Sequence, residues 1–191
     1  MKKLYALVFA LMLLLSTSIS AVALESKTIY RQNGAAAYAV WSETAGDVYT
    51  DKFLSVTKTN DGTDIYVSIC TFSTEGDYSC KWGYKFTPEA VFDINKKLES
   101  ATLSTVQVDL YDWYSPAMET VTIQAQWTGT GDATKGSYKV ISKYGDYTSK
   151  YSDRSTFREA TATGSIDDQE LGTSDFGAMV NFKSAYMFMK K

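Results

Sequence analysis

Apolar and polar residues alternate along much of the chain, and Gly, Asp and Asn interrupt the alternation at short intervals. A period of two places every second side chain on the same face of an extended strand, so this pattern predicts β-strands. We expect about nine or ten strands with no helices between them, which favours an all-β, antiparallel β-sandwich, with a β-barrel as the alternative. The expected strands lie within residues 29–34, 35–43, 48–58, 63–72, 81–86, 106–110, 121–127, 137–142, 155–166 and 180–190.

Residues 88–98, PEAVFDINKKL, fit two kinds of element. A helix would bring Val91, Ile94 and Leu98 onto one face, with Pro88 in the first turn, where proline is tolerated. A strand would instead place Phe92 and Ile94 on one face. Because the flanking elements are all β and the segment is short, we favour the strand.

The clearest hairpin joins the segments 106–110 and 121–127, in which apolar side chains alternate with polar ones. Placing Leu110 opposite Val121 brings the two apolar rows together on one face, as cross-strand packing requires. This register leaves residues 112–119, DWYSPAME, as the connecting loop.

The only two cysteines are Cys70 and Cys80, at the ends of CTFSTEGDYSC. In an exported chain such a pair is expected to form a disulfide, because the compartment is oxidising. If the two are directly opposite each other in a hairpin, Gly76 falls where a short loop requires a residue with positive φ.

The aromatic residues after Cys80 raise a question of register. A regular ladder would place Ile69 opposite Lys81 and would turn the aromatic row away from the apolar row of the partner strand. We therefore expect a β-bulge at or next to Lys81 that turns this aromatic row into the core. The side chains then expected to be buried beside Ile65, Val67 and Ile69 are Trp82, Tyr84 and Phe86. Alternation also assigns Trp41 and Trp127 to the core.

The N-terminus has the features of an export signal. Two lysines precede an apolar run from Leu4 to Leu15, and Ala21-Val22-Ala23 fits the small-x-small rule for cleavage. The run is too short to span a bilayer, which takes roughly 20 residues. We expect a signal peptide at residues 1–23, a single secreted domain at residues 24–191, an extracellular location and no membrane span after cleavage.

Composition limits the chemistry. The chain has no histidine, which excludes serine-histidine and cysteine-histidine nucleophile systems and histidine-ligated metals. The net charge of −3, and the short lysine pairs at residues 96–97 and 190–191, argue against nucleic acid or an anionic membrane as a partner. We expect no cofactor and no catalytic residues.

Two groups of acidic residues are candidate functional sites. Residues 166–175, IDDQELGTSD, offer carboxylates that calcium prefers, although their spacing matches no EF-hand, so a solvated acidic loop is favoured. A carboxylate pair for glycoside hydrolysis is the one enzyme mechanism that we expect to remain without histidine. The weak calcium candidates are Asp167, Asp168, Glu170 and Asp175, and the hydrolase candidates are Asp109, Asp112 and Glu119.

Trp113 and Tyr114 lie outside any alternating apolar row, in the DWYSPAME loop. Exposed aromatic residues on a loop are typical of contact surfaces, so this pair is the predicted ligand-contact site.

The stretches LESATL, WTGTGD, REATATG and NFKSAYMF resemble those of a group of small exported prokaryotic proteins of unknown function. The resemblance implies a secreted β fold and no activity. Together with the residues above, it predicts a non-catalytic protein that acts in binding or structure at or outside the cell surface. The alternative is a carbohydrate-binding module, a carboxylate-dependent glycoside hydrolase is less favoured, and the expected partner is a glycan or a cell-surface protein.

Overall fold

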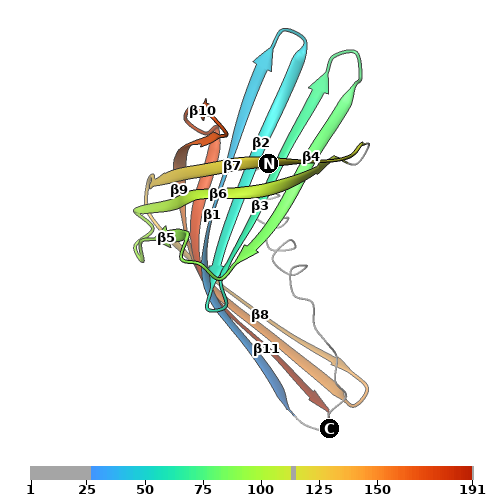
Figure 1. The fold of residues 1–191 in the computed structure, drawn as a ribbon. Helices are drawn as coiled ribbons and strands as arrows, with labels where there is room; N and C mark the ends of the chain where they lie inside the picture. The colour runs from blue at the N-terminus through green and yellow to red at the C-terminus, as the bar shows by residue number, and fades with distance from the viewer. Residues whose placement is uncertain (1–26, 113–114, 191) are drawn as a thin grey trace.

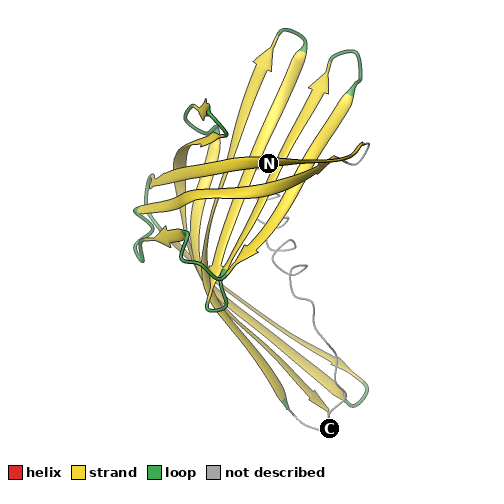
Figure 2. Ribbon diagram, viewed as in Figure 1, coloured by secondary structure: helices red, strands yellow, loops and turns green. Residues whose placement is uncertain are grey.

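The computed structural model describes residues 27–112 and 115–190, and it contains strands, turns and loops but no helix (Figure 2). The prediction of an all-β, antiparallel fold is confirmed, with eleven strands. The predicted signal peptide lies outside the described residues. The strands are β1 Thr28–Ala45, β2 Val48–Thr59, β3 Thr63–Ser73, β4 Tyr78–Thr87, β5 Phe92–Ile94, β6 Ser100–Asp112, β7 Ser115–Gly129, β8 Thr134–Tyr144, β9 Tyr147–Ile166, β10 Gln169–Leu171 and β11 Phe176–Lys190.

The strands form one closed ring of antiparallel pairs. Starting from β9, hydrogen-bonded neighbours follow in the order β11, β1, β2, β3, β4, β6 and β7, and β7 pairs with β9 again. The long strands β1, β2 and β3 run side by side, while β6 and β7 cross them at a steep angle (Figure 1). The ring is therefore folded into two layers, with β5, β6 and β7 lying over the main sheet.

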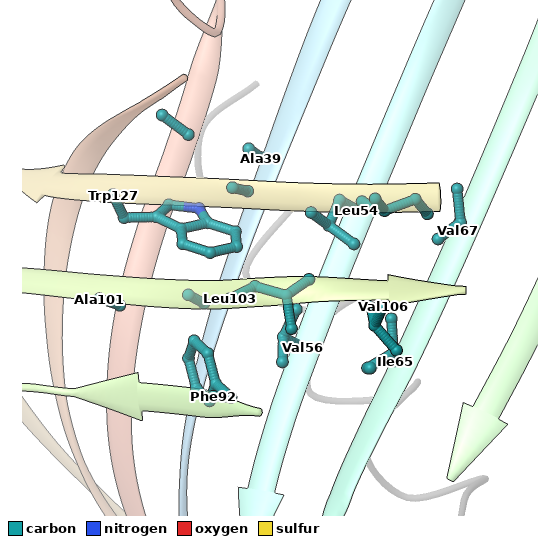
Figure 3. Packing of buried hydrophobic residues seen from close by; sticks show 14 of the residues in the cluster. Ala39, Leu54, Val56, Ile65, Val67, Phe92, Ala101, Leu103, Val106 and Trp127 are labelled. Carbon is teal, nitrogen blue, oxygen red and sulfur yellow. The ribbon is translucent and has the colours of Figure 1, made fainter. Parts of the chain in front are cut away.

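The apolar core lies between these two layers (Figure 3). Trp127 is the largest fully buried side chain; its ring meets Phe92 edge to face at 6.1 Å, and its Nε1–H donates to the Tyr38 carbonyl at 3.0 Å. Trp41 is also buried, as alternation predicts. Further core side chains from both layers include Leu54, Val56, Ile65, Val67, Leu103, Val108, Leu110, Val121 and Ile123.

The two layers come closest where β6 passes over β4. The strands share only the pairs Lys81–Asp112 and Trp82–Tyr111 before they diverge. Gly83 lies just beyond, and a β-carbon there would overlap the backbone oxygen of Asp109. Glycine is required at this corner because the β6 backbone occupies the space that any side chain would need.

An arm extends from one end of the main sheet (Figure 1). We define the arm as residues 28–33 of β1, all of β8, residues 147–157 of β9 and residues 181–190 of β11. The sheet order in the arm is β8-β9-β11-β1, and β8 is an edge strand. Within the part of the chain that the structure describes, no helix is long and apolar enough to cross a membrane.

The β6–β7 hairpin has the predicted apolar face but a different register. Leu110 lies opposite Glu119, and Val108 lies opposite Val121, so the predicted pairing was wrong by two residues. The reason is that both strands continue into the expected loop, up to the Asp112–Ser115 pair. A shift of two keeps the same side chains facing inward, so the core is unaffected.

The Cys70–Cys80 disulfide is confirmed, with the two Cα atoms 4.0 Å apart and directly opposite each other. Gly76 has a φ of 95°, as expected for the turn. The predicted bulge is wrong, because the ladder is regular and Ile69 pairs with Lys81.

The burial predicted to follow from that bulge is wrong as well. Trp82, Tyr84 and Phe86 are 38%, 54% and 49% exposed, on the face of β4 that points away from the core. The inner face of β4 instead carries Gly83 and two lysines. Lys81 binds Glu119 at 2.5 Å, and Lys85 Nζ donates to the Gln107 carbonyl at 2.9 Å.

The segment 88–98 forms the short strand β5, as favoured, and then a turn. Phe92 and Leu98 are both buried, and Leu98 adopts a φ of 58° at the end of this turn. Two of the residues that suggested a helix, Val91 and Ile94, pack against the core from the strand and its entry.

Candidate ligand-binding face

An exposed group of aromatic side chains covers the outer face of β2, β3, β4 and the end of β6, the face that points away from β5, β6 and β7. We call it the aromatic face. Regular pairing places its members on one side of the sheet, because Tyr66 lies opposite Tyr84 and Trp82 lies opposite both Ser68 and Tyr111. Its members are Phe53, Tyr66, Trp82, Tyr84, Phe86 and Tyr111, and all except Phe53 are at least one-third exposed.

The rings of the aromatic face support one another. Trp82 and Tyr111 have ring centroids 5.9 Å apart, and the rings of Phe53 and Tyr66 are also 5.9 Å apart. Along β4, alternate residues are about 6.8 Å apart, so Trp82, Tyr84 and Phe86 form a row of rings on a rigid strand. Contiguous exposed apolar surface of this kind is typical of interaction sites.

Polar groups are interleaved with these rings. The Tyr84 hydroxyl donates a hydrogen bond to the Asp64 carboxylate, which lies opposite Phe86 in the ladder. Partial burial, and then this hydrogen bond and the negative charge of Asp64, raise the pKa of Tyr84 to about 12. Tyr84 is therefore protonated at all physiological pH values, and its oxygen can accept a hydrogen bond from a ligand hydroxyl.

The predicted contact residues Trp113 and Tyr114 lie outside the described residues. Their neighbour in the chain, Tyr111, belongs to the aromatic face.

The hydrolase candidates are in structural contacts. Asp109 accepts a hydrogen bond from the Thr120 hydroxyl at 2.6 Å, across the β6–β7 ladder. Glu119 forms the salt bridge with Lys81, and Asp112 pairs with Ser115 at the end of the hairpin. The structure supplies no feature that assigns Asp109 and Glu119 to catalysis.

Two of the four calcium candidates, Asp167 and Asp175, accept hydrogen bonds from the protein backbone. The Asp167 carboxylate accepts from the backbone N–H of Thr122 at 2.8 Å, and the Asp175 carboxylate accepts from that of Ser42 at 2.7 Å. Asp168 and Glu170 are exposed. Among the residues described, no three acidic, cysteine or histidine side chains are grouped as a metal ion would require.

Asp153 lies on the outer face of the arm, opposite Tyr138. Its carboxyl group gives a testable pH dependence of the stability of the fold. Partial burial raises the pKa of its carboxyl. A raised pKa means that folding disfavours the ionised form, so the cost is present above the folded-state pKa and disappears as pH falls through it. We expect Asp153→Asn to raise the melting temperature at pH 7 and to leave it unchanged at about pH 3, where this carboxyl is largely protonated in both the folded and the unfolded chain. Scanning calorimetry at both pH values checks this, and an equal difference at the two would contradict it.

Sequence reasoning missed the aromatic face because it assigned three of its side chains, Trp82, Tyr84 and Phe86, to the core. The signal was nonetheless in the sequence, since the regular ladder implied by the two cysteines turns Trp82, Tyr84 and Phe86 outward.

No protein-family model, no curated protein and no solved structure matches this chain.

Proposed function

We propose that this protein is an exported, non-catalytic binding protein, and that its aromatic face binds a polysaccharide. The observation that carries the proposal is the exposure of Trp82 and Tyr84 on a rigid strand of the main sheet. Flat aromatic side chains stack on the apolar faces of sugar rings, and a row of them suits an extended chain of sugars. Asp64 and Ser68 lie on the same face and offer hydrogen bonds to sugar hydroxyl groups.

Three observations support the wider proposal. The signal-like N-terminus and the disulfide fit an oxidising compartment outside the cytoplasm. The structural contacts of Asp109 and Glu119 favour a binding role over hydrolysis. The resemblance to small exported proteins agrees with export and with a role without catalysis.

Binding to a panel of polysaccharides tests the proposal. We expect the purified protein to bind at least one of them, and Trp82→Ala to weaken that binding by at least about thirtyfold, as removing a central aromatic contact does. Trp113→Ala should have a smaller effect of the same sign if the neighbouring loop contributes.

Tyr138→Ala is the matched control, because Tyr138 is 61% exposed but lies on the arm. It should leave polysaccharide binding unchanged. Failure to bind any member of a broad panel, or binding that Trp82→Ala does not weaken, would reject the aromatic face as a polysaccharide site and favour a protein partner.

A further inference from the structure

The inner face of the arm is strongly basic. This is the face of the arm continuous with the core side of the main sheet, beyond the reach of β5, β6 and β7. Asn181 marks the limit of that layer, since its side-chain amide donates to the Lys96 carbonyl at 3.0 Å. In the row of Asn181 and beyond it, alternation along four strands places seven cations on one face: Arg31, Lys135, Lys139, Lys143, Lys150, Arg154 and Lys183.

Among the strand residues that the structure describes in the arm, no carboxylate shares this face. The one acidic residue on the arm strands, Asp153, has the opposite parity and points to the outer face with Tyr138. Among the described residues none of the seven cations forms a salt bridge, and Arg154 lies directly opposite Lys183. Like charges opposite each other destabilise a sheet. The arm therefore keeps a repulsive arrangement that an anionic surface would relieve.

Edge protection explains only some of these cations. Lysines on an exposed edge strand discourage pairing with another chain, which is a sufficient reason for Lys135, Lys139 and Lys143 on β8. Lys150, Arg154 and Lys183 lie on β9 and β11, which are paired on both sides. Charge is also separated within the molecule, because acidic residues outnumber basic ones by more than two to one in the rest of the described chain.

Apolar side chains lie among the cations near the tip of the arm. Ile141, Lys150, Met187 and Ile29 form one continuous cross-strand row, with Met189 in the next row. Ile29 and Ile141 are 39% and 49% exposed. At the tip itself, Tyr144 is 87% exposed.

We propose that the inner face of the arm binds the surface of an anionic lipid bilayer. The basic residues of this face are attracted to negatively charged headgroups. The aliphatic side chains favour a bilayer over a soluble polyanion as the partner. Their insertion at the boundary of headgroups and acyl chains stabilises binding to a bilayer, and a soluble polyanion offers no such apolar environment. The acidic remainder of the molecule would be repelled, which orients the aromatic face away from the membrane. This proposal does not depend on polysaccharide binding.

Vesicle co-sedimentation tests it, using protein recovered after export, with its N-terminus defined by mass spectrometry. We expect binding to vesicles that contain phosphatidylglycerol, little binding to pure phosphatidylcholine, and weaker binding at high salt. Each cation near an anionic surface strengthens binding roughly fivefold, so Lys139→Gln/Lys143→Gln/Lys150→Gln should bind about a hundredfold more weakly.

A matched variant, Lys85→Gln/Lys96→Gln/Lys97→Gln, removes the same charge away from the arm and should bind almost as the wild type does. A second variant, Ile29→Ser/Ile141→Ser, should bind the anionic vesicles at least about fivefold more weakly. Melting temperatures show whether each variant is folded.

Three results would overturn the proposal. Equal binding to neutral and anionic vesicles, or no binding to either, would remove the electrostatic basis. Equal losses in the two lysine variants would show an effect of net charge and not of this face. Wild-type vesicle binding by Ile29→Ser/Ile141→Ser would favour a soluble polyanion, and salt-sensitive self-association without vesicle binding would favour a second copy of the chain.

Discussion

Trp127→Ala is expected to lower the free energy of unfolding by about 3–5 kcal/mol. The side chain is 1% exposed and lies between the two layers, so its removal leaves a cavity that neighbouring strands cannot fill without breaking their pairing. The variant also loses the edge-to-face contact with Phe92 and the hydrogen bond to the Tyr38 carbonyl, which joins β7 to β1. In a chain of this size, the melting temperature should fall by about 10 °C or more.

Two further substitutions separate the causes. Trp127→Phe keeps most of the ring volume and loses the hydrogen bond, so it should cost only about 1–2 kcal/mol. Trp82→Ala removes the same side chain from the outer face, and we expect a loss of about 1 kcal/mol. Chemical denaturation measures all three. Equal losses for Trp127→Ala and Trp82→Ala would contradict the assignment of one to the core and the other to the surface.

The alternation of apolar residues was sufficient to predict the fold class and most of the core. Trp127 lies in a strand whose alternate residues are apolar on one side and polar on the other, so parity alone decides its direction. In β6 and β7 the same rule fixed the face but not the register. A two-residue slip leaves the apolar faces matched, and only the real length of the connection selects between registers.

The rule failed in β4, where the more apolar row faces outward. Its inner row holds Lys81, Gly83 and Lys85, which the alternation predicted to face solvent. The crossing of the β6–β7 hairpin explains the difference. The β6 backbone leaves no room for a side chain at Gly83, and the hairpin supplies acceptors for both lysines, Gln107 on β6 and Glu119 on β7. A contact between strands that are not neighbours in sequence is invisible to a local pattern.

The basic face of the arm was hidden for a similar reason. Arg31 and Lys183 are 152 residues apart in the chain, and along any one strand their neighbours are polar or apolar residues of ordinary kinds. Only the β1–β11 and β9–β11 registers place them together with Arg154. The net charge of −3 describes the sum of a basic arm and an acidic remainder, so it was a poor guide to either.

Replacing both cysteines, Cys70→Ser/Cys80→Ser, is expected to lower the free energy of unfolding by about 2–3 kcal/mol. The bridge closes a short loop between adjacent strands, and its removal increases the conformational freedom of the unfolded chain. The melting temperature should fall by about 5–10 °C. Wild-type protein melted in the presence of a reductant should match the double variant, because both lack the same covalent link.

The position of the bridge gives this prediction a local signature. Cys70 and Cys80 lie on the same side of the β3–β4 ladder as Trp82, beyond the last β4–β6 pair. Neither β6 nor β7 pairs with this end of the hairpin, which is held by the β2–β3 and β3–β4 ladders and by its own turn. Hydrogen exchange in the double variant should therefore increase most in residues 70–80 and little in the buried segments of β6 and β7. A uniform increase would show that the bridge acts on global unfolding alone. An unchanged melting temperature would show that the ladder orders the hairpin without it, and the aromatic face would then keep its geometry in a reducing compartment.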